Sequence, residues 1–89
     1  MNGPLHILHL EDDPDFSELV RSLLQQAGLV AELNVVSTRE AYEQALKQGR
    51  YDIVLADYML PGFTGVEALQ LFRKQSTETP FLLVSGTIG

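Results

Sequence analysis

Four short apolar runs alternate along this chain with segments whose apolar residues recur at helical spacing. The runs are Leu5–Leu10, Ala31–Val36, residues 53–56 and Phe81–Val84. Strands and helices that alternate with short connections form right-handed crossovers, and these produce a parallel sheet with helices on both faces. The pattern therefore predicts an α/β fold, a doubly wound parallel sheet in a single domain over residues 1–89.

The first helix has clear start and stop signals. Asp13 is a good N-cap, and Pro14 suits the first helical position, where no backbone N–H is needed. Gly28 stands where the helix should end. Six apolar residues at helical spacing form a stripe that we expect in the core: Phe16, Leu19, Val20, Leu23, Leu24 and Ala27.

Two further helices are indicated by capping boxes, in which a hydroxyl and an acid three residues later satisfy each other's backbone N–H groups. Ser37 and Glu40 make one such pair, and Gly49 ends that helix. Thr64 and Glu67 make the other, after a turn-rich stretch at residues 60–65. The apolar residues predicted to face inward from these helices are Ala41, Tyr42, Ala45, Leu46, Val66, Leu69 and Phe72.

Charge and composition exclude several classes of protein. Twelve acidic residues against six basic ones give a net charge of −6, and an acidic surface repels nucleic-acid phosphates. The chain has no cysteine, which excludes disulfides, thiolate metal sites and a cysteine nucleophile. Neither a long apolar span nor a signal-peptide pattern is present in the sequence, so we expect a cytoplasmic location.

Acidic residues stand where two of the predicted strands end. Glu11, Asp12 and Asp13 follow the first strand, and Asp57 follows the third. Ligands gather at the carboxyl ends of parallel strands, so neighbouring first and third strands would bring Glu11, Asp12 and Asp57 into one pocket. Two unit charges about 4 Å apart repel by about 4 kcal/mol at an effective dielectric of about 20, which favours a proton or a cation in such a pocket.

The chemistry of this pocket has both a functional and a structural interpretation. Carboxylate ligands without histidine or cysteine favour Mg²⁺ or Mn²⁺, and bound Mg²⁺ would leave Asp57 able to act as a nucleophile toward phosphorus. Acids at strand ends also cap helices, which is the role we expect for Asp13. Capping does not explain Asp57, because no helix follows it directly. Ser85 either donates its hydroxyl to a phosphoryl oxygen or only forms a turn with Gly86.

The two histidines are not expected to form a metal site. His6 and His9 are three positions apart in a strand, so their side chains point to opposite faces. A partly buried, hydrogen-bonded side chain is the expectation for each.

Three motifs in order resemble the receiver domain of bacterial two-component response regulators. Residues 8–14 (Leu-His-Leu-Glu-Asp-Asp-Pro) look like the acidic-pair segment of that family. Residues 57–62 (Asp-Tyr-Met-Leu-Pro-Gly), followed by Gly65, are similar to its Asp-x-x-Met/Leu-Pro segment. Residues 83–86 (Leu-Val-Ser-Gly) resemble its fourth strand and the small hydroxyl residue that follows.

This resemblance implies a signalling switch rather than an enzyme. Asp57 would accept a phosphoryl group from a sensor histidine kinase or a phosphotransfer protein. Asp12 and Asp57 would hold Mg²⁺ directly, with the Met59 carbonyl as a third ligand and Glu11 acting through water. Ser85 would be the switch hydroxyl.

The resemblance also implies a flavodoxin-like sheet of order 2-1-3-4 that is incomplete after the fourth strand. The fourth helix, fifth strand and fifth helix of the family have no counterpart here, and neither has its phosphate-pairing lysine. Phosphorylation of this segment is therefore expected to be impaired. An exposed edge at Phe81–Val84 carries no charge, so we expect self-association through it.

Other functions stay open. The acidic pocket could be inherited but unused in a phosphorylation-independent interaction module, a pseudo-receiver that binds through its exposed edge. An aspartate-nucleophile phosphatase would need a second acid where this chain has Met59. A flavodoxin would present hydroxyls and glycines to phosphate where this chain has Glu11, Asp12 and Asp13.

Overall fold

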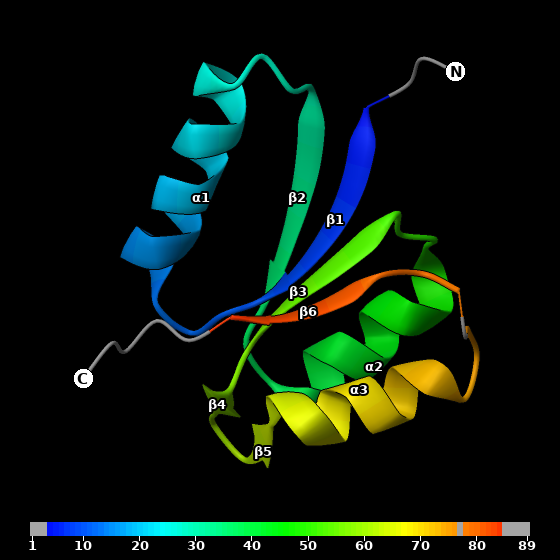
Figure 1. Cartoon of the computed structure of the whole chain (residues 1–89). Helices are drawn as coiled ribbons and strands as arrows, with labels where there is room; N and C mark the ends of the chain where they lie inside the picture. The colour runs from blue at the N-terminus through cyan, green and yellow to red at the C-terminus, as the bar shows by residue number, and fades with distance from the viewer. Residues whose placement is uncertain (1–3, 77, 85–89) are drawn as a thin grey trace.

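The computed structural model describes residues 4–76 and 78–84, which form one four-stranded sheet with helices on both sides (Figure 1). Along the chain the elements are β1 (Leu5–Leu10), α1 (Pro14–Gln26), β2 (Ala31–Val36), α2 (Arg39–Gln48), β3 (Ile53–Asp57), β4 (Met59–Leu60), β5 (Phe63–Thr64), α3 (Gly65–Arg73) and β6 (Phe81–Val84). None of the helices in this part of the chain combines the length and apolar character needed to cross a membrane.

The sheet has the predicted topology. Its strands are parallel and follow the order β2-β1-β3-β6, so the fourth predicted strand is β6 at one edge. Leu10 is aligned with Ala56, which places the ends of β1 and β3 side by side. The turn-rich stretch contains more structure than predicted, because β4 and β5 pair as a small antiparallel ribbon around Gly62.

One face of the sheet is closed by α2 and α3. Leu8 and Val54 point to this closed face and are completely buried in the same cluster as Tyr42 and Phe72. The Tyr42 hydroxyl donates to the Ala68 carbonyl at 2.7 Å, which ties the two helices together beneath the sheet. This cluster is the core of the described part of the chain.

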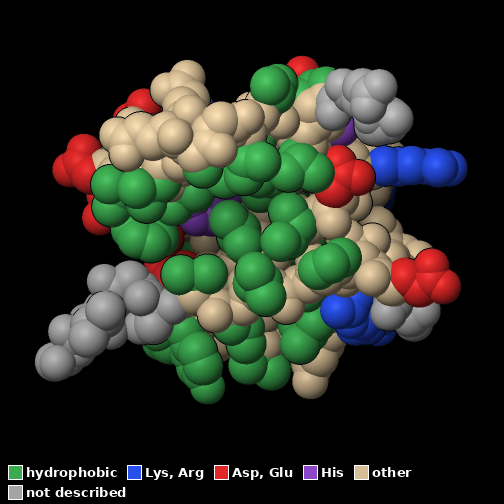
Figure 2. All heavy atoms as spheres, turned by 45° about the horizontal axis from the view of Figure 1, so that its top comes forward, with side chains coloured by type: hydrophobic (Ala, Val, Ile, Leu, Met, Phe, Trp, Pro, Cys, Tyr) green, Lys and Arg blue, Asp and Glu red, His purple; other side chains and the backbone are tan. Residues whose placement is uncertain are grey.

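The opposite face carries α1, next to β2, and is called the open face below (Figure 1). Our prediction that the whole α1 stripe is core was wrong, because Leu19 and Leu23 are about half exposed. No helix of the described residues covers β3 and β6 on this face, so Leu82 is exposed and Leu55 is only half-buried. Hydrophobic side chains accordingly gather in a broad patch on the side shown in Figure 2.

Two local predictions also need correction. The N-cap of α2 is Thr38 rather than Ser37, since the Thr38 hydroxyl accepts from the Ala41 N–H at 3.1 Å. In α3 the capping box of Thr64 and Glu67 is confirmed, but Val66 is exposed. Helix α3 instead buries its other side, at Gly65, Ala68 and Phe72.

Candidate metal centre

Three carboxylates meet at the carboxyl edge of the sheet, as predicted. Glu11 and Asp12 follow β1, and Asp57 ends β3. One carboxylate oxygen from each residue lies within 4.8 Å of those from the other two. Glu11 is buried, Asp57 is half-buried and Asp12 is exposed, so the group opens toward solvent on the Asp12 side. Three hard oxygen ligands in one open cluster fit Mg²⁺.

The pKa of the Glu11 carboxyl is raised above its usual value. Burial of its carboxyl is the largest cause that raises the pKa of Glu11. A hydrogen bond from the Asp13 N–H to the Glu11 carboxylate, 3.1 Å long, acts in the opposite direction. The charges of Asp57 and Asp12 raise the pKa further. A cation in the cluster would relieve this repulsion.

Asp13 lies beside the cluster but has a different role. Its carboxylate accepts from the Asp15 N–H at 2.9 Å and caps α1, as the sequence predicted. The cap fixes the direction in which the chain leaves β1, and so positions Glu11 and Asp12.

Gly65 brings the start of α3 against the backbone of Asp57. A Cβ atom at Gly65 would lie 2.5 Å from the Asp57 carbonyl oxygen and 2.6 Å from a methyl group of Leu83. The Gly65 N–H also donates to the Tyr58 carbonyl at 2.9 Å, which closes the loop that follows Asp57. Only a residue without a side chain fits this approach, and this explains the glycine at the end of the motif.

His9 is a buried neighbour of the site whose surroundings the sequence did not predict correctly. The side chain is 1% exposed and lies near Phe16, with ring centroids 6.1 Å apart. Within residues 4–76 and 78–84 its Nδ1 atom has no hydrogen-bond partner, contrary to our expectation. Burial lowers the pKa of His9, and the charge of Asp57 opposes that shift. The other histidine, His6, is exposed, and its Nδ1 atom lies 3.3 Å from the Oε1 atom of Glu32.

Two further residues belong to the predicted site. Met59 begins β4, two residues after Asp57, and its side chain is exposed. Ser85 lies outside the described residues.

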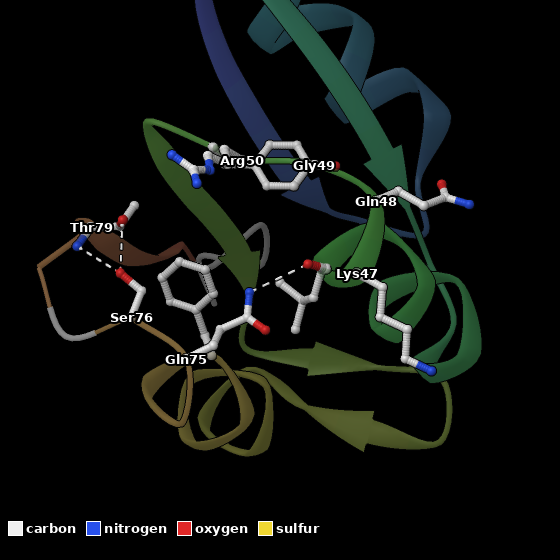
Figure 3. A pocket seen from close by; sticks show the side chains of 10 residues that line it. Lys47, Gln48, Gly49, Arg50, Gln75, Ser76 and Thr79 are labelled. Atoms are coloured by element: carbon white, nitrogen blue, oxygen red, sulfur yellow. Dashed lines mark hydrogen bonds between the residues drawn. The ribbon is translucent and has the colours of Figure 1, made fainter.

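A hollow of about 640 Å³ lies elsewhere, between the C-terminal ends of α2 and α3 (Figure 3). Its walls include Lys47, Arg50 and Phe72. Hydrogen bonds from Gln75 to the Leu46 carbonyl and between the hydroxyls of Ser76 and Thr79 cross it. The described residues that line it include no carboxylate and none of the three residues of the acidic cluster.

Comparisons with known proteins agree with this geometry. The family described as response regulator receiver domain matches residues 7–88 of the chain. The uncharacterized transcriptional regulatory protein YkoG of Bacillus subtilis is 32% identical over 80 residues, which are 90% of this chain and 34% of that protein. The cell cycle response regulator CtrA of Brucella ovis is 31% identical, over 96% of this chain and 36% of that protein. The chain thus spans about a third of the length of these relatives.

The fold is also similar to that of solved structures. The chemotaxis response regulator CheY4 of Vibrio cholerae superposes with a TM-score of 0.80 and 27% identity, over 98% of this chain and 72% of that one. The receiver domain of sensor histidine kinase PA1611 from Pseudomonas aeruginosa superposes with a TM-score of 0.79 and 23% identity. That likeness covers 96% of this chain and 70% of the other.

Proposed function

Since this chain belongs to the response regulator receiver domains, we propose that it accepts a phosphoryl group on Asp57 in the presence of Mg²⁺. The observation that carries the proposal is the convergence of Glu11, Asp12 and Asp57 within 4.8 Å at the ends of two adjacent strands. Receiver domains act as phosphoacceptor switches in two-component signalling, and the cluster has the ligands that such a switch needs. The PA1611 receiver domain, of the same fold, holds a magnesium ion in its active site cleft.

Each residue of the cluster has a distinct proposed role. Asp12 and Asp57 hold the ion directly, Glu11 acts through water, and the Met59 carbonyl completes the ligand set. Mg²⁺, when bound, offsets the negative charge of the carboxylates and of an incoming phosphoryl group. Ser85 is proposed as the switch hydroxyl.

Transfer requires Asp57 to act as the nucleophile. A carboxylate oxygen of Asp57 attacks phosphorus, forming a P–O bond while the P–N bond of a phosphohistidine donor breaks. The released imidazole nitrogen keeps the bonding pair and takes a proton from solvent. Asp57 is half-buried at a strand end, so part of this residue is exposed to solvent in the described part of the chain.

The chain itself can be tested with acetyl phosphate and Mg²⁺, with intact mass as the measurement. Because phosphorylation of this segment is expected to be impaired, we expect only part of the wild-type chain to gain the mass of one phosphoryl group, and Asp57→Asn to gain none. Asp15→Asn is the matched control, because Asp15 is an exposed acid in the first turn of α1 that lies outside the cluster. Equal labelling of Asp57→Asn and wild type would overturn the proposal.

We propose a sensor histidine kinase or a phosphotransfer protein as the donor, and a cytoplasmic location in which it would be met. We also propose that the chain associates with itself through the edge strand β6. Its sequence, Phe81 to Val84, carries no charge that would deter pairing.

A second candidate function is a phosphorylation-independent interaction module. The open face favours it, because Leu19, Leu23 and Leu82 are about half exposed there. The two functions differ in their need for Mg²⁺: saturable Mg²⁺ binding at Asp12 supports the switch, and its absence supports the interaction module.

A further inference from the structure

The hollow between α2 and α3 lies at the end of the sheet opposite the acidic cluster. Its wall at residues 49–51 leads into the start of β3, whereas Asp57 ends that strand. Because the strands of this sheet are parallel, the hollow and the cluster lie at its two different ends. Its volume of about 640 Å³ falls within the range of pockets that hold small molecules, about 300–1,000 Å³. The hollow is therefore large enough for a ligand and separate from the proposed magnesium site.

Arg50, an exposed residue in the lining, differs from the other arginines of the chain. Arg21 and Arg39 each pair with a glutamate on their own helix, and Arg73 donates to two backbone carbonyls. Among the residues that the structure describes, Arg50 forms no ion pair, although the net charge of the chain is −6. Its guanidinium thus has the capacity to bind an anion.

The charges around this hollow favour an anion as well. Lys47, in the last turn of α2, adds a second positive charge to the lining. Asp52 and Glu78 are adjacent in sequence to lining residues, but neither lines the hollow. The Asp52 carboxylate instead accepts from the His6 N–H at 2.8 Å. A concave site with two cations and no anion in its described lining attracts negatively charged ligands.

The hydroxyls of Ser76 and Thr79 add a hydrogen-bond donor on the same side of the hollow as Arg50 (Figure 3). Their oxygens lie 3.0 Å apart and share one hydrogen bond, in which either can be the donor. Each hydroxyl has one proton, so the pair has a second proton that the shared bond does not use. A guanidinium and a hydroxyl are the donors that proteins commonly use for phosphate oxygens.

One wall of the hollow is fixed by contacts of its own. The Tyr51 hydroxyl accepts from the Asn34 side-chain amide at 2.9 Å and donates to the Ala45 carbonyl at 3.5 Å. These bonds hold the ring beside Arg50 in sequence and tie it to both β2 and α2. A wall that is already ordered lowers the entropy cost of binding a ligand.

We propose that this hollow binds a small molecule that carries a phosphate group, with the phosphate on Arg50 and on the hydroxyl pair of Ser76 and Thr79. A phosphate group presents three acceptor oxygens, enough for the guanidinium fork and for the hydroxyl, whereas a carboxylate has two. The rest of the molecule would extend along the hollow toward Lys47 (Figure 3). This ligand site is independent of Mg²⁺ and of phosphoryl transfer to Asp57.

Titration with inorganic phosphate, without Mg²⁺ and at constant ionic strength, tests the site through the NMR signals of the backbone amides. The wild type should show saturable shifts centred on Arg50, Tyr51 and Ser76. Arg50→Gln should weaken binding at least about tenfold, because it removes both the charge and the fork. Arg39→Gln is the matched control, since it removes the same charge from an exposed arginine that does not line the hollow. It should bind phosphate like the wild type.

Acetate, titrated in the same way, separates phosphate from carboxylate ligands and should bind at least about tenfold more weakly. The proposal is overturned by a wild type without saturable shifts, by equal binding of phosphate to Arg50→Gln and wild type, or by equal binding of acetate and phosphate. Asp57→Asn should bind phosphate like the wild type, because Asp57 lies at the other end of β3. Failure of this site is therefore distinguishable from failure of the phosphoacceptor function.

Discussion

On the closed face of the sheet, Leu8 and Val54 are fully buried against α2 and α3, whereas on the open face Leu82 is half exposed. The strands carry apolar side chains on both faces, so the difference lies in what covers them. On the closed face two helices meet through the hydrogen bond from Tyr42 to Ala68. The open face has α1 beside β2, and Leu19 and Leu23 of this helix are about half exposed. An apolar pattern therefore identifies a face that can be buried, and only a packing partner buries it.

The largest expected effect compares one leucine from each face. Leu8→Ala leaves a cavity in the closed core and should cost about 2–5 kcal/mol of unfolding free energy. Leu23→Ala removes the same atoms from a side chain that is 54% exposed, so it should cost within about 1 kcal/mol. Urea unfolding of both variants measures the difference. Similar losses for the two would contradict the contrast between the faces.

A smaller effect tests the cap of α2, which helps close the core. Thr38→Ala removes the hydroxyl that accepts from the Ala41 N–H and should cost about 1 kcal/mol. Ser37→Ala, its neighbour, should change the unfolding free energy by no more than about 0.5 kcal/mol. If Ser37→Ala proved the more costly change, the N-cap would be at Ser37.

The third effect is a pH dependence at the acidic end of the sheet. Because burial raises the pKa of Glu11, the folded chain binds its proton more tightly than the unfolded chain does. Stability should therefore fall as pH rises through the titration range of Glu11. Glu11→Gln removes this term, so without Mg²⁺ the variant should gain on the wild type toward neutral pH. Parallel curves of stability against pH for the two chains would contradict the raised pKa.

Strand periodicity predicted the parallel sheet, whereas the order of its strands was implied by the resemblance to receiver domains. With β1 and β3 as neighbours, Glu11, Asp12 and Asp57 converge because the carboxyl ends of parallel strands meet at one edge of the sheet. The sequence did not separate Ser37 from Thr38, since either hydroxyl can begin a helix at that point. The exposure of Leu19 and Leu23 was not predicted either. Helical spacing indicates which residues form an apolar stripe, but not whether another element packs against that stripe. That His9 Nδ1 has no hydrogen-bond partner in the described part of the chain depends on neighbours from other elements.

Magnesium titration of the chain, followed by the NMR signals of the backbone amides, tests the acidic cluster most directly. The wild type should show saturable shifts centred on Glu11, Asp12 and Asp57. Asp12→Asn should abolish saturation, while Asp13→Asn should keep it, since the two variants lose the same charge one residue apart and only Asp12 belongs to the cluster. Equal binding by both variants, or no binding by the wild type, would contradict a magnesium site for phosphoryl transfer to Asp57.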